Sequence, residues 1–244
     1  MRNFKVTVEY DGSGYSGWQR QGNTKNTIQY KFEEIIRKML GVKTEIFASG
    51  RTDSGVHAKG QVFNFKCETF LEAQDIKNYI NKYLPLDIRV LCVEEVDERF
   101  HSRLNVKKKT YSYRMCYGGK LPVFERKYLT LIDDIPDVEL MLKGAKKLIG
   151  KYDFKGFSTK STKKSTIREI YEIVIDSQDD IIEILITGNG FLYNMVRIIA
   201  GTLYEIGTGK RKPESIDDIL INKDRSLAGV TMPPEGLCLL KVYY

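Results

Sequence analysis

Residues 44–66, TEIFASGRTDSGVHAKGQVFNFK, carry the clearest indication of the fold class. Residues 44–49 and 61–66 carry aromatic and β-branched side chains, which predict two short strands around a glycine-rich loop. On each side of this pair, alternating apolar residues predict one strand, and apolar residues at helical spacing predict one helix. The predicted elements of the first hundred residues are strand 6–10, helix 28–40, strands 44–49 and 61–66, helix 76–84 and strand 88–96.

The rest of the chain repeats this order. We expect strand 109–117, helix 138–149, strands 167–175 and 181–187 around a polar turn at 178–180, a long apolar helical face from Phe191 to Ile206, a short helix 216–221 and a final strand 236–244. Two successive βαββαβ patterns predict an α+β fold of two ferredoxin-like halves, whose sheets join or face each other across a cleft. The boundary is expected in the loop near residues 100–106, which gives domains 1–105 and 106–244.

Composition excludes several classes of protein. The 244 residues are 42% hydrophobic and 29% charged, which excludes a disordered chain, collagen and a coiled coil. No stretch approaches the roughly 20 apolar residues of a membrane helix, and the N-terminus lacks the apolar core of a signal peptide. The four cysteines lie far apart and only two histidines are present, which argues against a zinc site and against a disulfide framework. We therefore expect a reduced, cytoplasmic protein without a metal.

The net charge of +7 is concentrated in three basic runs, at residues 99–114, 151–168 and 210–212. The first carries six basic residues and no acidic one, with Tyr111 and Tyr113 among them. Basic side chains close to aromatic rings suit a phosphate backbone with unstacked bases. A solvated, lysine-rich surface is the alternative for each run taken alone.

Two short motifs fail on their context. Residues 12–17 have the G-x-G-x-x-G spacing of a dinucleotide site, but helical spacing begins only at Ile28, so the sequence predicts a loop that Trp18 anchors by packing. Asp53-Ser54-Gly55 matches the D-S-G of aspartic proteases, which need two such carboxylates; no second copy occurs in the chain, so this interpretation requires a dimer formed through the loop.

The loop at residues 50–58 places one acid, Asp53, between two glycines and close to Arg51, which predicts a strained and exposed turn. Two interpretations remain open. The aspartate forms an Asx turn that satisfies its own backbone, or a neighbouring cation holds it ionised as a nucleophile. His57 suits packing in the turn better than general-base catalysis, and the other histidine, His101, is distant in the sequence.

Residues 50–58 with Gly60-Gln61-Val62 resemble the active-site motif of the tRNA pseudouridine synthase A family. The resemblance covers essentially the whole chain. The other segments similar to the motifs of this family are Tyr10-Asp11-Gly12 with Tyr15, Gly17-Trp18-Gln19 and Thr27-Ile28-Gln29; Lys109-Thr110-Tyr111-Ser112-Tyr113, in which Thr110 is a small departure; residues 190–197; and Ala228-Gly229 with residues 233–237.

The resemblance implies a pseudouridine synthase fold around a basic, RNA-binding cleft and an intramolecular transfer that turns uridine into pseudouridine without a cofactor. It implies that Asp53 is the nucleophile and that Tyr111 packs against the target base. Arg51 and Arg197 are implied as the cations that accompany the carboxylate and the substrate. It further implies tRNA as the substrate, modified at uridines 38 to 40 of the anticodon arm, and a homodimeric enzyme.

Two other functions stay as alternatives. One is a non-catalytic RNA-binding module with the same fold, which the complete set of Asp53, Arg51 and Tyr111 disfavours. The other is a glycoside-type hydrolase, which needs a second carboxylate near Asp53. No motif in the chain supplies that second acid.

Overall fold

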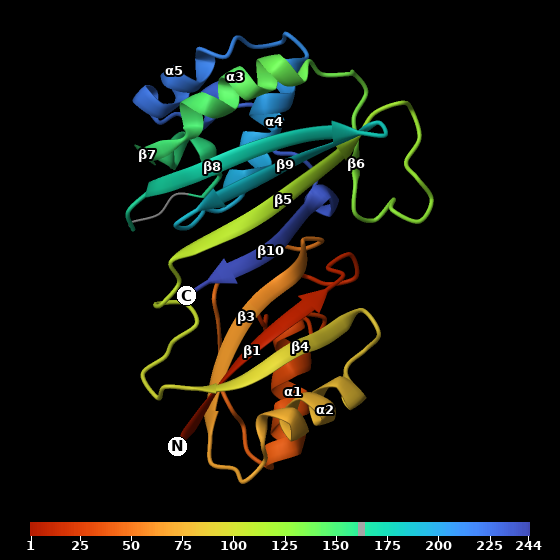
Figure 1. The fold of residues 1–244 in the computed structure, drawn as a ribbon, viewed down its shortest axis with the longest axis vertical. Coiled ribbons are helices and arrows are strands. Elements are labelled where there is room, and N and C mark those ends of the chain that lie inside the picture. The colour runs from red at the N-terminus through yellow and green to blue at the C-terminus, as the bar shows by residue number, and fades with distance from the viewer. Residues whose placement is uncertain (161–163) are drawn as a thin grey trace. The chain divides into compact units, whose positions relative to one another are not determined.

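The computed structural model describes residues 1–160 and 164–244, so the basic run expected at 151–168 lies partly outside the described residues. The chain divides into two compact units. Unit 1 comprises Met1–Lys107 with Cys238–Tyr244, and unit 2 comprises Lys108–Leu237. In both units helices pack on antiparallel strands, which confirms the predicted α+β fold class (Figure 1). Within the described residues, no helix is long and apolar enough to cross a membrane.

Unit 1 has the ferredoxin-like order of strands. β3 lies between β1 and β2, β4 lies on the other side of β1, and these pairings are all antiparallel. β10 pairs in parallel with β3, with Cys238 opposite His57. Figure 1 shows α1 and α2 together on one face of this sheet. The elements of unit 1 are β1 (Arg2–Tyr10), α1 (Ile28–Leu40), β2 (Ile46–Ala48), β3 (His57–Cys67), α2 (Ala73–Tyr83), β4 (Ile88–Val96) and β10 (Leu237–Tyr243).

The ends of α1 follow from its own sequence. The Thr27 hydroxyl accepts a hydrogen bond from the Tyr30 amide at 3.3 Å and caps the N-terminus. Gly41 ends the helix at a φ of 74°, in the left-handed region that glycine adopts without strain, and its N–H donates to Arg37 O. Both ends are those that the sequence predicts.

The core of unit 1 is aromatic. Trp18 is 1% exposed and lies 6.2 Å from the ring of Phe32 on α1 and 6.0 Å from the ring of Phe63 on β3. Phe32 and Phe63 are themselves 4.9 Å apart, measured between ring centroids. The expectation that Trp18 anchors its loop by packing is therefore confirmed.

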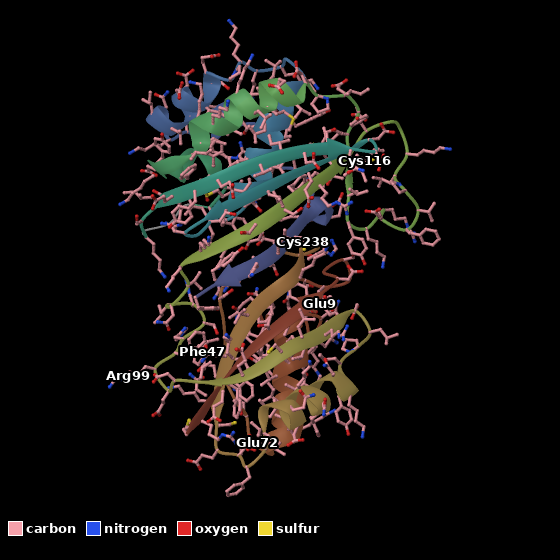
Figure 2. All side chains as sticks on the ribbon, viewed as in Figure 1. Glu9, Phe47, Glu72, Arg99, Cys116 and Cys238 are labelled. Carbon is pink, nitrogen blue, oxygen red and sulfur yellow. The ribbon has the colours of Figure 1, made fainter. Side chains whose placement is uncertain are left out.

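The segment that follows β4 is held by contacts with β2 and β3. The ring of Phe47, labelled in Figure 2 with Arg99, lies 5.0 Å from the ring of His101. Ser102 N donates to Asn64 Oδ1 at 2.9 Å. Arg99 and Arg103 of the first basic run lie on this segment and are exposed, so two charges of that run project from a fixed backbone.

Unit 2 carries a sheet in the order β5-β9-β8-β7, with antiparallel neighbours, and β6 pairs in parallel with the end of β5. The helices of this unit gather on one side of β8 and β9 (Figure 1). The elements of unit 2 are β5 (Lys108–Cys116), β6 (Thr130–Leu131), α3 (Val138–Leu148), β7 (Gly150–Asp153), β8 (Ile167–Gln178), β9 (Ile181–Gly188), α4 (Met195–Gly207), α5 (Ser215–Asn222) and the short 3-10 helices Phe154–Phe157, Arg225–Leu227 and Pro234–Gly236.

Several predicted element boundaries differ from those of the structure, and two of the differences have a clear tertiary cause. The helical face expected from Phe191 starts only at Met195, because Asn194 adopts a left-handed conformation that cannot continue an α-helix to earlier residues. β3 starts at His57 and not at residue 61, because residues 57 and 58 find strand partners in β10 and β1. Both differences come from contacts that the local pattern does not contain.

Candidate active site

Asp53 lies in the loop between β2 and β3 and is partly exposed. The loop turns back at this point, because Val56 N donates to Asp53 O at 3.2 Å. Gly55 has a φ of 79° and supplies the left-handed residue that the turn needs. Arg51 is exposed on the same loop, two residues before the aspartate.

The residues on either side of Asp53 are fixed by the end of β1 and by the segment that follows it. Thr52 is 6% exposed; its hydroxyl lies 2.8 Å from the Tyr10 hydroxyl, and its carbonyl accepts from Trp18 N at 3.0 Å. After Asp53, the Ser54 hydroxyl donates to Tyr15 O at 3.0 Å. The loop is therefore anchored immediately before and after its carboxylate.

Two glycines allow this close approach. A Cβ atom at Gly12 would lie 2.0 Å from Val56 O, and one at Gly17 would lie 2.8 Å from Thr52 O. Gly17 also has a φ of 88°, a backbone conformation that residues with a side chain rarely adopt. The first and last glycines of the G-x-G-x-x-G motif therefore allow this segment to contact the Asp53 loop. As the sequence predicts, no helix opens at this motif, since α1 begins at Ile28.

His57 belongs to the same support. It is 4% exposed, and its Nδ1 accepts a hydrogen bond from Gly12 N at 3.0 Å. The carboxylate of Asp11 lies 3.3 Å from the same nitrogen. The expectation that His57 packs in the turn is confirmed, and the contact holds the start of β3 against the segment after β1.

In unit 2, Tyr111 lies on β5 and is 9% exposed. Its ring meets the ring of Phe191 edge-on, at 5.2 Å between centroids and an interplanar angle of 84°. Tyr113, on the same face of β5, is fully buried, and its hydroxyl donates to Pro233 O at 2.8 Å and lies 2.7 Å from Thr130 Oγ1. Burial raises the pKa of Tyr113, so its hydroxyl stays protonated and keeps this bond.

Arg197 lies in the first turn of α4 and is partly buried. Its Nε donates to Met232 O at 2.6 Å, and its Nη1 donates to Asn194 Oδ1 at 2.9 Å. Both acceptors are neutral, so neither of these two contacts pairs the guanidinium with an opposite charge. The charge of Arg197 also favours the ionised form of Tyr113, although burial outweighs this effect on the pKa of the tyrosine.

The structure therefore places the predicted residues in two sets. Arg51 and Asp53 share one loop of unit 1. In unit 2, the Tyr111 ring contacts Phe191, whereas Arg197 is held through Asn194 and a main-chain carbonyl, so these two side chains have different neighbours. In the stretches 1–160 and 164–244, no group of three His, Cys, Asp or Glu residues could hold a metal ion.

The residues that position these groups are not evident from the sequence alone. The partner of Thr52 is Tyr10, and the partners of Arg197 are Asn194 and the carbonyl of Met232. Tyr10 and Asn194 both lie in segments that carry the family resemblance, so their identity was visible in the sequence. Nothing in the local pattern, however, says which side chain each of them contacts.

Comparison with known proteins shows the family of this chain. The family described as tRNA pseudouridine synthase matches residues 6–105 and 145–244, which defines the class as RNA-modifying isomerases. The tRNA pseudouridine synthase A 2 of Clostridium perfringens is 45% identical, with 100% of each chain covered, and the tRNA pseudouridine synthase A of Bacillus sp. is 46% identical, with 94% of each covered. The chain belongs to the tRNA pseudouridine synthase family and isomerises uridine to pseudouridine in tRNA.

A more distant likeness is found among solved structures. A chain in the crystal structure of a Cbf5-Nop10-Gar1 complex matches with a TM-score of 0.41 and 10% identity. The match covers 97% of this chain and 48% of that chain.

Proposed function

We propose that Asp53 is the nucleophile of this isomerisation and that its targets are uridines 38 to 40 in the anticodon arm of tRNA. The carrying observation is the fixed loop. Thr52 is hydrogen-bonded to Tyr10 at the end of β1 and Ser54 to Tyr15 in the segment after it, while Asp53 between them stays partly exposed. We further propose, from the family resemblance, that the enzyme works as a homodimer in the cytoplasm.

The chemistry requires one ionised carboxylate in a fixed position. The N1–C1′ bond of the uridine breaks, the base turns, and a C5–C1′ bond forms. The proton at C5 is lost and N1 gains one, so atoms balance without an oxidant or a second substrate. Attack of the Asp53 carboxylate on C1′ or on C6 fits this balance equally well, and both need a nucleophile whose backbone does not move.

The other residues have supporting roles in this proposal. The target base must leave its stack to be reached. Tyr111 offers an aromatic ring, and base stacking on such a ring is worth about 1–3 kcal/mol. Arg197 carries a charge bonded to neutral acceptors, and Arg51 is exposed beside the nucleophile, so both suit contact with the negatively charged substrate.

The test is release of tritium from tRNA that carries 5-tritiated uridine. Asp53→Asn should abolish release and leave the Kd for tRNA within about threefold, because the amide has the same shape and size. Glu45→Gln, which removes an exposed carboxylate of the same unit, should keep the wild-type rate. Transcripts with cytidine at positions 38 to 40 should release no tritium.

The two parts of this proposal fail separately. Turnover by Asp53→Asn would show that another group is the nucleophile. Release from the cytidine-substituted transcripts would show that the targets lie elsewhere in the tRNA.

A further inference from the structure

Asn194 departs from ordinary behaviour at the start of a helix. An N-cap asparagine normally has extended backbone, and its side chain accepts a hydrogen bond from an amide of the first turn. Asn194 instead has a φ of 61° and a ψ of 4°, and its side chain makes no capping hydrogen bond. Only its carbonyl takes part in the helix, by accepting from Ile198 N at 3.0 Å.

The side chain of Asn194 makes two other contacts. Its Oδ1 accepts from Arg197 Nη1 at 2.9 Å, and its Nδ2 donates to Thr159 Oγ1 at 2.9 Å. The amide therefore bridges the segment before β8 and the guanidinium on α4. A left-handed non-glycine residue is unfavourable, and such residues persist where the surroundings impose them, often at functional sites.

These contacts fix the plane of the Arg197 guanidinium. A guanidinium has five N–H donors in a rigid planar fork. The Nε–H is bonded to Met232 O, and one Nη1–H is bonded to Asn194. Two bonds in the plane, made to groups on different segments, prevent rotation about the last bonds of this long side chain. The remaining donors then have one defined direction.

We propose that Asn194 is a positioning residue that holds Arg197 in the orientation needed for catalysis on the RNA. The inference rests on the role proposed above for Arg197. It explains why the helix begins with a strained residue whose side chain is turned away from capping. A fixed guanidinium has no rotation to lose when the substrate binds, and misplacement of such a group by about 1 Å can cost on the order of 100-fold in rate.

Asn194→Gly separates this role from a structural one. Glycine adopts the left-handed conformation without strain, so the backbone at the start of α4 is kept while the amide is lost. The matched control is Asp179→Gly. Asp179 is exposed in the turn between β8 and β9 and has a φ of 52°, so the same backbone change is made outside α4 and its N-terminus.

Asn194→Gly should lower kcat for tritium release by roughly 10- to 100-fold and change KM by less than about threefold. Its midpoint in urea should stay close to that of the wild type, since relief of the left-handed strain offsets the two lost hydrogen bonds and the greater backbone freedom of the unfolded chain. Asp179→Gly should keep the wild-type kcat. A wild-type kcat for Asn194→Gly, or a fall in its urea midpoint that accompanies the loss of activity, would overturn the proposal.

A double-mutant cycle with Arg197→Lys tests whether Asn194 acts through the arginine. If it does, Asn194→Gly should cause little further loss in the Arg197→Lys background, because the group that it orients is already gone. Losses that multiply would overturn the proposal. A wild-type rate for Arg197→Lys alone would instead refute the role proposed for Arg197, and with it this inference. A loss of activity in Arg197→Lys, combined with full activity of Asn194→Gly, would refute only the inference.

Discussion

At Gly12 the absence of a side chain lets two loops touch. A Cβ atom there would lie 2.0 Å from Val56 O, and Gly12 N also donates to His57 Nδ1. A Cβ atom at Gly14, two residues later, would have nothing within 4 Å of it. The same glycine-rich segment therefore contains one position that requires glycine and one that does not.

We expect Gly12→Ala to lower the free energy of unfolding by about 1–3 kcal/mol, since the loop backbone must move to admit the methyl group. Because Val56 closes the turn of Asp53, kcat should also fall by about tenfold or more. Urea unfolding and tritium release measure both effects. Gly14→Ala is the control and should stay within about 0.5 kcal/mol of the wild type. Equal behaviour of the two variants would contradict the role given to this contact.

At the scale of elements, Asp153 ties together three parts of unit 2. It ends β7, and its Oδ1 accepts from Thr166 Oγ1 at 2.6 Å and from Lys155 N at 3.1 Å. Its other oxygen lies 3.1 Å from the Nζ of Lys223, the residue that ends α5. Burial acts to raise the pKa of Asp153, but these bonds to Thr166, Lys223 and Lys155 outweigh it and the pKa is lowered.

A lowered pKa makes the stability of unit 2 depend on pH. Ionised Asp153 stabilises the folded state above the ordinary carboxyl pKa of about 4, and this contribution is lost as the pH falls through the lower pKa of the folded state. Asp153→Asn should therefore be less stable than the wild type by about 1 kcal/mol at pH 7, and the difference should shrink below about pH 4. Urea unfolding at several pH values checks this; a difference that is constant from pH 7 to pH 3 would show that the charge is not responsible.

Elements differ in how much of them the sequence predicts. The bounds of α1 could be predicted because Thr27 and Gly41 act on backbone groups within four residues. The start of α4 could not, because Asn194 bonds to Thr159, which is 35 residues away. β7 was likewise not expected, since its four residues gain their strand geometry by pairing with β8.

At the scale of the whole molecule, the basic runs differ in whether their charges are paired with acidic side chains. In the third run, Lys210 pairs with Asp134 at 2.9 Å, and Arg211 pairs with Glu205. In the first run, Arg99 and Arg103 project into solvent from the segment after β4. A charge that is already paired adds little to the binding of a polyanion, so the first run is the better candidate for tRNA contact.

The double variant Arg99→Ala/Arg103→Ala should weaken tRNA binding and reduce the slope of log Kd against log salt by about 1.4 to 1.8, since each lost phosphate contact contributes about 0.7 to 0.9. The control, Lys147→Ala/Lys210→Ala, removes the same charge from two lysines that are paired with aspartates and should keep the wild-type slope. Filter binding over a range of salt concentrations measures both. Equal slopes for the two doubles would show that only net charge matters.

The fold class, most of the strands and helices, the loop around Asp53 and the family can be predicted from the sequence, because periodicity, caps and motifs act over a few residues. Which strand lies beside which becomes known only from the folded chain. β1 pairs with β3, and β10 joins β3 from the other end of the chain. The same holds for what each side chain near the site contacts, such as Tyr10 on Thr52 and Asn194 on Arg197. These pairings depend on burial and on hydrogen bonds between separate elements, and such contacts are defined only when the chain has folded.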